Sequence, residues 1–374
     1  MVNFLNFKDK SNVFIYGSNG FVFLKYIVSG RSSQLISFNK IYINFSVLID
    51  MVRNIALIKH GPLFLNHACM LRVKRPEIVI TYCDNHPLYH KLDKLLGDEI
   101  LFITIQNGNR FFNVPSKNVN TSVKGLNFQE KTANLENVYH TNFFCFSEFD
   151  KILYKKLGAT IKFYHPVGSI KNSFYLQGLK KTQKEYDLCF IATNRSVGNV
   201  STYKNHDKIF TLLCEWLSRY VSEFPDKKIC IAGSMHNFNE ELKWFKKYNL
   251  DKFLIKYDGF SSYKVIDKSE VSFSCMTTLY FESLSRGNKM FLIEAYKNLE
   301  LRLPTIMKPS QFLYLYGDSY NEFRAKVNEL INMPQDSFLL ETHDYVNFMM
   351  TNSKHLFAHE YIKNYINLHF DAAP

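Results

Sequence analysis

An aspartate follows a hydrophobic run in the first half of the chain, where residues 79–82 (VITY) lead into Asp84 and His86. The run predicts a buried strand, and open α/β sheets bind ligands beyond the carboxyl ends of such strands. Asp84 is therefore a candidate base for activating a hydroxyl, or a candidate nucleophile toward an electrophilic carbon. An alternative is that Asp84 caps a helix beginning near His86, because aspartate is favoured at that position.

A second hydrophobic run, residues 102–105 (FITI), ends in Gln106, Asn107, Gly108 and Arg110. The two amides can orient hydroxyl groups, and the guanidinium of Arg110 can hold a phosphate or a carboxylate through two hydrogen bonds. An ordinary strand-to-loop turn would use the same residue types, so both interpretations stay open.

A third group of candidates lies where the two halves of the chain meet. Gly168 and Ser169 can offer backbone and hydroxyl donors to a phosphate, although Pro166 and Gly168 also suit a plain turn. Arg195, after an expected strand over 186–192, and His165, when protonated, are candidate cations for a leaving phosphate.

The fourth segment carries the most information. An expected strand over 271–274 ends in Ser274 and leads through Thr277 and Thr278 into an expected helix over 278–286. The free N–H groups and the dipole of a helix N-terminus favour an anion. Glu282 lies one turn after Thr278 on the same side and could hold a ribose or sugar hydroxyl. Capping of the helix by Thr277 alone would need no ligand.

Short apolar runs alternate with helical stretches, which is typical of βαβ units and a parallel sheet. In the first half we expect strands over 12–16, 40–45, 77–82, 100–105, 142–146 and 161–164, and helices over 48–73, 86–96 and 147–157. Residues 108–137 are expected to form a long loop. In the second half we expect strands over 186–192, 228–232, 253–256, 271–274 and 289–293, and helices over 204–223, 239–248, 261–267, 278–286, 319–332 and 354–368.

The length of 374 residues favours two domains, given about 150 residues for a typical domain. The polar stretch near 170–185 is the expected linker. We therefore expect an N-terminal, acceptor-side domain over 1–175 and a nucleotide-binding domain over 186–345. A helical segment over 346–374 is expected to return to the N-terminal domain.

The formal net charge is +12, which suits phosphates, nucleic acid or an anionic membrane surface. Basic residues are scattered in short pairs, and no nucleic-acid motif is present, so nucleic acid is not an expected partner. A solvated basic surface or peripheral attachment to an inner membrane would both explain the charge.

Seven cysteines with no CxxC pair sit mostly in apolar runs, which argues for buried thiols and a reducing compartment. The chain opens without a signal pattern and contains no run of ~18 apolar residues. The expected location is the cytoplasm, including the cytoplasmic face of the inner membrane.

These four segments, in this order, resemble those of bacterial surface-carbohydrate glycosyltransferases of GT-B fold, related to the β-Kdo and nonulosonic acid transferases. The likeness covers about 80–370 and depends on the aspartate after a strand, the QNG turn, and a Ser-Thr pair followed by Glu that appears here as Thr277-Thr278 and Glu282. It implies two Rossmann-type α/β domains whose parallel sheets face an interdomain cleft. Two His-Pro pairs, His86-Pro87 and His165-Pro166, are similar to one that binds the CMP phosphate in sialyltransferases, but both lie in the first domain.

The resemblance implies a CMP-activated acidic sugar as donor, with Thr277, Thr278 and Glu282 near the nucleotide and Asp84 at the anomeric centre. The acceptor would be a surface polysaccharide or another glycan, or a lipid-linked precursor. No DxD motif follows a strand, so transfer without metal or other cofactor is expected. A UDP- or GDP-sugar transferase, an epimerase of the same fold and a non-catalytic scaffold for glycan assembly are the alternatives.

Overall fold

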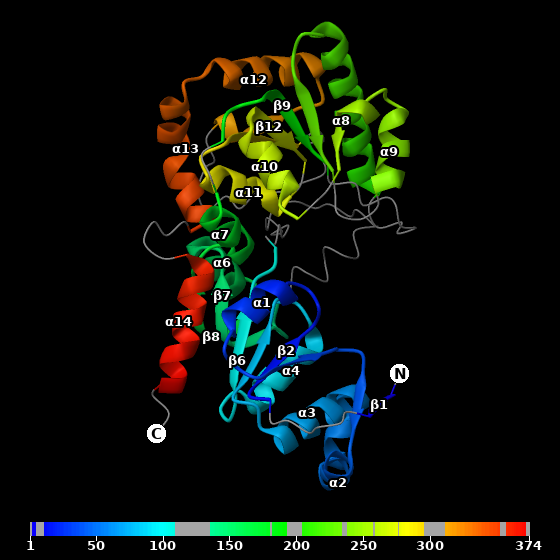
Figure 1. Ribbon diagram of the computed structural model, residues 1–374, viewed down its shortest axis with the longest axis vertical. Coiled ribbons are helices and arrows are strands. Elements are labelled where there is room, and N and C mark those ends of the chain that lie inside the picture. Colours follow the sequence, from blue (N-terminus) through cyan, green and yellow to red (C-terminus); the bar gives the residue numbers. More distant parts are fainter. Residues whose placement is uncertain are drawn as a thin grey trace. The chain divides into compact units, whose positions relative to one another are not determined.

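The structure is a computed structural model, and it forms two compact α/β units (Figure 1). It describes residues 2–4, 11–108, 135–179, 182–192, 204–233, 238–256, 259–275, 277–294, 311–351 and 357–371. Unit 1 contains the described parts of 1–108, 134–174 and 351–374, and unit 2 contains those of 175–350. The chain thus leaves unit 1 after Phe174 and returns to it at Thr351.

Unit 1 is built on a six-stranded parallel sheet with the order β3-β2-β5-β6-β7-β8. From β2 the chain first extends the sheet to one side and then crosses to the other, so the connections diverge between β2 and β5. The strands are β2 (Val13–Tyr16), β3 (Ser33–Ile36), β5 (Ile78–Thr81), β6 (Leu101–Ile105), β7 (Tyr139–Cys145) and β8 (Thr160–Pro166). A separate parallel pair joins β1 (Val2–Phe4) to β4 (Ile41–Ile43).

The helices that lie between consecutive strands of unit 1 are the crossovers that parallel pairing requires, and the last two helices follow the final strand of its sheet. They are α1 (Phe21–Ile27), α2 (Phe45–Arg53), η1 (Ile55–His60), α3 (Pro62–Lys74), α4 (Pro87–Leu96), α6 (Glu148–Lys156), α7 (Ile170–Gln177) and α14 (Ala358–Asp371).

The single helix expected over 48–73 is three segments, α2, η1 and α3. The break lies at Gly61, whose φ of +107° is outside the helical region, and at Pro62, which opens α3. Proline suits the first position of a helix and cannot continue one from the preceding turn. The strand expected over 40–45 belongs to the small β1-β4 sheet, and α1 and β3 were not expected.

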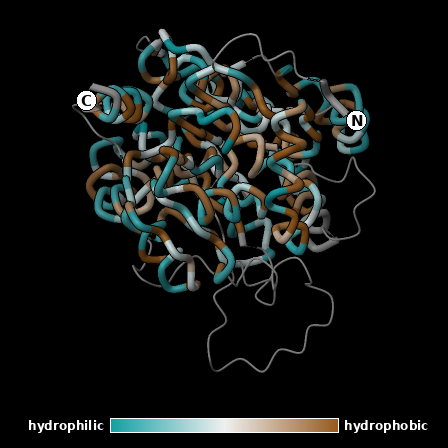
Figure 2. The backbone as a smooth tube through the Cα atoms, turned by 90° about the horizontal axis from the view of Figure 1, so that it is seen from below, coloured by the Kyte–Doolittle hydropathy of each residue, from teal (hydrophilic) through white to brown (hydrophobic). Residues whose placement is uncertain are grey.

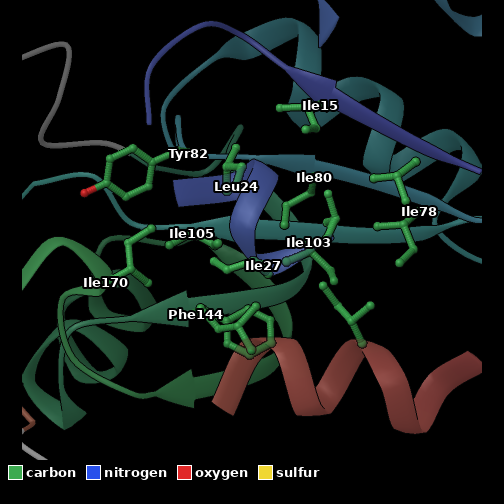
Figure 3. Close-up of a cluster of buried hydrophobic side chains, with 14 of the residues drawn as sticks. Ile15, Leu24, Ile27, Ile78, Ile80, Tyr82, Ile103, Ile105, Phe144 and Ile170 are labelled. Atoms are coloured by element: carbon green, nitrogen blue, oxygen red, sulfur yellow. The ribbon is translucent and has the colours of Figure 1, made fainter. Parts of the chain in front are cut away.

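The return helix α14 completes the core of unit 1. Ala358, Ile362 and Ile366 join a cluster formed by β2, β5, β6, β7 and α1, in which Phe144 lies next to α14 (Figure 3). Lys363 of α14 also donates a hydrogen bond to Ser29 at the end of α1. A second cluster, on α3 and α4, covers the opposite face of the sheet.

Unit 2 repeats this plan with a six-stranded parallel sheet in the order β11-β10-β9-β12-β13-β14. Here the connections diverge between the central strands β9 and β12. The strands are β9 (Tyr186–Ile191), β10 (Ile229–Ala232), β11 (Leu254–Ile255), β12 (Ser269–Ser274), β13 (Lys289–Glu294) and β14 (Tyr314–Tyr316).

The expected helices of unit 2 are present with small changes at their ends, whereas α13 and β14 were not expected. The helical segments are α8 (Lys204–Glu223), α9 (Phe238–Lys246), η3 (Asp251–Phe253), α10 (Ser261–Asp267), α11 (Thr278–Ser285), η4 (Gln311–Leu313), α12 (Tyr320–Asn332) and α13 (Gln335–Met349).

The central strands are buried on both faces, so they are continuous apolar runs rather than alternating ones. All four residues of β5 and all five of β6 are buried. Figure 2 shows hydrophobic (brown) and hydrophilic (teal) stretches along the backbone. This is why the central strands could be found from the sequence.

Candidate functional site

Each unit has one sheet edge where a ligand is expected by topology. In open parallel sheets, ligands bind beyond the carboxyl ends of the strands at the point where the connections diverge. That point lies beyond β2 and β5 in unit 1, and beyond β9 and β12 in unit 2. The sequence-predicted residues can be placed against these two edges.

In unit 1 the edge is formed by the loop Gly17 to Gly20 after β2 and by Tyr82 after β5. Both glycines have positive φ, +81° and +66°, and a Cβ on Gly20 would overlap the ring of Tyr82. Only glycine therefore allows the loop to approach Tyr82 this closely. Sequence reasoning missed this loop, although a strand followed by two glycines and a helix was a usable signal.

Asp84 also follows β5, but its side chain is buried, at 1% exposure. The hydroxyl of Tyr154, on α6, donates a hydrogen bond of 2.6 Å to Asp84 Oδ2. The N-cap residue of α4 is His86, which makes no side-chain cap. Asp84 is thus a buried carboxylate bound to a neighbouring helix in this structure.

Two buried histidines lie near this carboxylate. The rings of His90 and His140 are 4.7 Å apart, and burial lowers the pKa of His90 to about 4 and that of His140 well below its usual range. The charge of Asp84 acts in the opposite direction on the pKa of His90. Desolvation dominates, so both imidazoles are neutral at pH 7.

Gln106 joins three elements through its side-chain amide. Its Nε2 donates to Gly108 O at 3.1 Å and to Asp150 Oδ1 at 2.8 Å, and its Oε1 accepts from Phe146 N at 2.9 Å. The amide is fully buried, so these bonds fix the end of β6 against α6. Arg110, which the sequence pairs with it, lies outside the described residues.

The segment with His165, Gly168 and Ser169 is a tight turn of unit 1. Gly168 has φ +89°, its N–H donates to Cys145 O, and a Cβ there would overlap the carbonyl oxygen of Thr351. Ser169 Oγ accepts from Asn172 N in the first turn of α7. The Gly168 N–H is therefore used within the turn, and the Ser169 hydroxyl oxygen is an acceptor at the start of α7.

His165 stacks on Phe144, with ring centroids 4.4 Å apart, and burial lowers its pKa. A lowered pKa disfavours the protonated form on which its expected role as a cation depends. The other expected cation, Arg195, lies outside the described residues.

The edge of unit 2 brings together Ser274, Thr277 and Thr278. Ser274 ends β12 and donates a hydrogen bond to Ile191 O at the end of β9, so it connects the two strands between which the connections diverge. Thr277 is the N-cap of α11 and accepts from Leu279 N at 3.2 Å. The expected cap is therefore present, and the start of α11 remains partly exposed at Thr277 and Thr278.

Glu282 lies inward of this helix start. Its carboxylate is buried, and the Tyr263 hydroxyl donates a 2.6 Å hydrogen bond to Oε2. The C-cap residue of α11 is Arg286, whose guanidinium pairs with Asp267 at 3.0 Å and lies over the Tyr263 ring. A buried polar network thus fixes α11 to α10.

Among the described residues, no group of three or more histidine, cysteine, aspartate or glutamate side chains is arranged to hold a metal ion. None of the helices that the structure describes is both long and apolar enough to cross a membrane.

The comparisons with known proteins rest on structure alone. No protein-family model matches this sequence, and no curated protein matches it. A variant of the wall teichoic acid polymerase TagF is 9% identical, with 96% of this chain and 89% of that chain covered and a TM-score of 0.58. The S. aureus MnaA structure with UDP is 10% identical, with 96% and 97% covered and a TM-score of 0.54.

At this identity the likeness concerns the fold. Together with the strand order, it confirms the expected α/β architecture of GT-B type, with one parallel Rossmann-like sheet in each unit. A cleft between the domains and the expected domain boundaries stay predictions.

Proposed function

We propose that the chain is a glycosyltransferase that binds a nucleotide-activated sugar beyond β9 and β12 of unit 2. The observation that carries the proposal is the start of α11, where Thr277 and Thr278 remain partly exposed at the point where the sheet connections diverge. The N–H groups of this helix start and its dipole suit a phosphate. The Thr278 hydroxyl would add a further contact.

For the donor, we propose a CMP-linked acidic sugar of the Kdo or nonulosonic acid type, transferred to a bacterial surface glycan or a lipid-linked precursor of one. The support is the motif resemblance of Thr277, Thr278 and Glu282. A UDP-sugar is the second candidate, because the MnaA structure contains UDP, and the TagF structures include one soaked with CDPG. No cofactor enters the proposed reaction.

The fixed neighbours of Glu282 limit what it can do. Its carboxylate already accepts a hydrogen bond from Tyr263, so a sugar or ribose hydroxyl would share the carboxylate with that tyrosine. In unit 1, Asp84 would act as base or nucleophile, and Tyr154 would orient it. A non-catalytic scaffold is favoured by one observation, the burial of Asp84 and Gln106 within hydrogen bonds of the fold itself.

The first experiment is a thermal-shift panel of CMP, CDP, UDP, GDP and their sugars on the wild type and Thr278→Val. A ligand at a hundred times its Kd adds about 2.7 kcal/mol of stability, which raises the unfolding midpoint. We expect the response to CMP to weaken in Thr278→Val. The matched control is Thr160→Val, which changes an exposed threonine of unit 1 and should respond as the wild type does.

The outcomes separate the candidates. A response to UDP or GDP that exceeds the response to CMP would replace the proposed donor while keeping the transferase. No response to any nucleotide or nucleotide sugar would overturn the transferase and favour the scaffold.

A further inference from the structure

Helix α2 presents an apolar stripe to the outside of unit 1. Phe45, Leu48, Ile49 and Val52 follow the spacing i, i+3, i+4, i+7 that places side chains on one face of a helix. Their exposed fractions are 79%, 44%, 36% and 75%. Val47, on another face of the helix, is the residue buried in the core. The more apolar side of α2 therefore faces outward, the reverse of what a helix at a core requires.

The stripe continues into η1, where Ile55 and Ile58 are 59% and 46% exposed. We call these six side chains the α2–η1 face: Phe45, Leu48, Ile49, Val52, Ile55 and Ile58. They are six of the 17 exposed large hydrophobic residues in the described part of the chain, gathered within 14 residues. Apolar side chains concentrated in this way mark an interaction surface, whereas scattered ones do not.

The charges around this face are basic. Arg53, Lys59 and His60 are exposed on the same two segments. The only acidic residue in 44–61 is Asp50, which is half-buried and accepts a hydrogen bond from Asn54 Nδ2 at 3.1 Å. Apolar side chains bordered by cations suit a surface that is apolar inside and anionic at its boundary.

We propose that the α2–η1 face docks unit 1 on a membrane surface rich in anionic phospholipid. The apolar side chains would enter the boundary between headgroups and acyl chains, and Arg53 and Lys59 would contact the phosphates. A second copy of the chain is a poorer occupant, because pairing this face with itself would bring like charges together on a chain of net charge +12. The proposal does not depend on the glycosyl transfer proposed above.

The test is co-sedimentation with vesicles of phosphatidylethanolamine and phosphatidylglycerol, and with vesicles of phosphatidylcholine alone. The wild type is expected to bind the anionic vesicles preferentially. The double variant Phe45→Ser/Val52→Ser should bind at least about tenfold more weakly, because two inserted apolar side chains are lost. The matched control, Leu340→Ser/Leu368→Ser, changes side chains that are 81% and 70% exposed elsewhere and should bind like the wild type.

A charge variant, Arg53→Gln/Lys59→Gln, should also bind more weakly and should lose much of the salt dependence of binding. The proposal would be overturned if the wild type did not bind anionic vesicles. It would also be overturned if all variants bound these vesicles as strongly as the wild type. If analytical ultracentrifugation showed a dimer that Phe45→Ser/Val52→Ser dissociates, with no vesicle binding, the face would belong to a second copy. An unfolding midpoint in these variants close to that of the wild type would show that the fold is unaffected, so a loss of vesicle binding would belong to the α2–η1 face itself.

Discussion

At the scale of single residues, Asp84 has a structural role in the buried fold and a proposed catalytic role. A carboxylate at 1% exposure needs hydrogen bonds to remain buried, and Tyr154 supplies one at 2.6 Å. The same contact would orient the carboxylate if a substrate reached it. Only a variant that keeps the shape and removes the charge can separate the two roles.

We expect Asp84→Asn to lower the rate of glycosyl transfer by about a thousandfold, since an amide is neither a base nor a nucleophile of comparable strength. The amide oxygen can still accept from Tyr154, so the unfolding midpoint should change little. The rate is measured with the donor identified by the thermal-shift panel.

Asp93→Asn is the matched control for this substitution. Asp93 is another buried carboxylate of unit 1, and it accepts from the backbone N–H and the hydroxyl of Thr141. Its loss should affect stability rather than turnover. An Asp84→Asn protein with full activity would remove Asp84 from the catalytic role.

At the scale of elements, unit 1 depends on a helix that the chain supplies last. Ile362 and Ile366 of α14 are fully buried in the cluster that contains Phe144. Removing either side chain should leave a cavity in this cluster and should also remove apolar contacts.

We expect Ile362→Ala to cost about 2–5 kcal/mol of unfolding free energy, whereas Leu368→Ala should cost less than about 0.5 kcal/mol. Leu368 lies on the same helix and is 70% exposed. The difference in unfolding free energy is measured by urea unfolding, with cleavage of unit 1 in limited proteolysis as the readout. Equal losses in both variants would show that α14 contributes little to the core.

The sequence predicted the elements whose signals are local. Apolar runs marked β5, β6 and β9, and α11 was found from Thr277 and Thr278 at its start. By contrast, α1 is a short apolar segment without a polar face, and β3 includes polar residues, so neither has a distinctive pattern. The transferase-like order of motifs correctly predicted the fold.

Much of the candidate site depended on contacts that sequence cannot reveal. The bond from Gln106 joins it to Asp150, 44 residues away, and Tyr154 lies 70 residues from Asp84. Spacing along a strand predicts that a polar side chain reaches the sheet edge. It does not predict which residue of another helix will form a hydrogen bond with that side chain.

At the scale of the whole molecule, the two units should differ in their response to acid. Among the residues that the structure describes, burial lowers the pKa of six histidines, and these lie in unit 1: His67, His86, His90, His140, His165 and His359. Below pH 6.5 the unfolded chain binds protons that these folded imidazoles do not. The free energy of unfolding therefore decreases as the pH is lowered. Asp93 opposes this, since burial raises its pKa to about 7, but one carboxyl cannot offset several imidazoles.

We therefore expect the unfolding free energy of unit 1 to decrease between pH 6.5 and pH 4, by ~1.4 kcal/mol per pH unit for each uncompensated proton. Thermal unfolding across this range measures it. His90→Gln should reduce the dependence, and His343→Gln, which changes an exposed histidine of unit 2, should not. A flat profile in the wild type would contradict the predicted role of the buried imidazoles.

The return of the chain to unit 1 at Thr351 has a consequence for biosynthesis. A ribosome releases the strands of unit 1 first, then the described elements of unit 2, and only afterwards Ile362 and Ile366. Until those residues emerge, the apolar face around Phe144 lacks its cover and is open to chaperones or to aggregation. The described elements of unit 2 are all made before α14, so the part whose strands are synthesised first is the part that matures last.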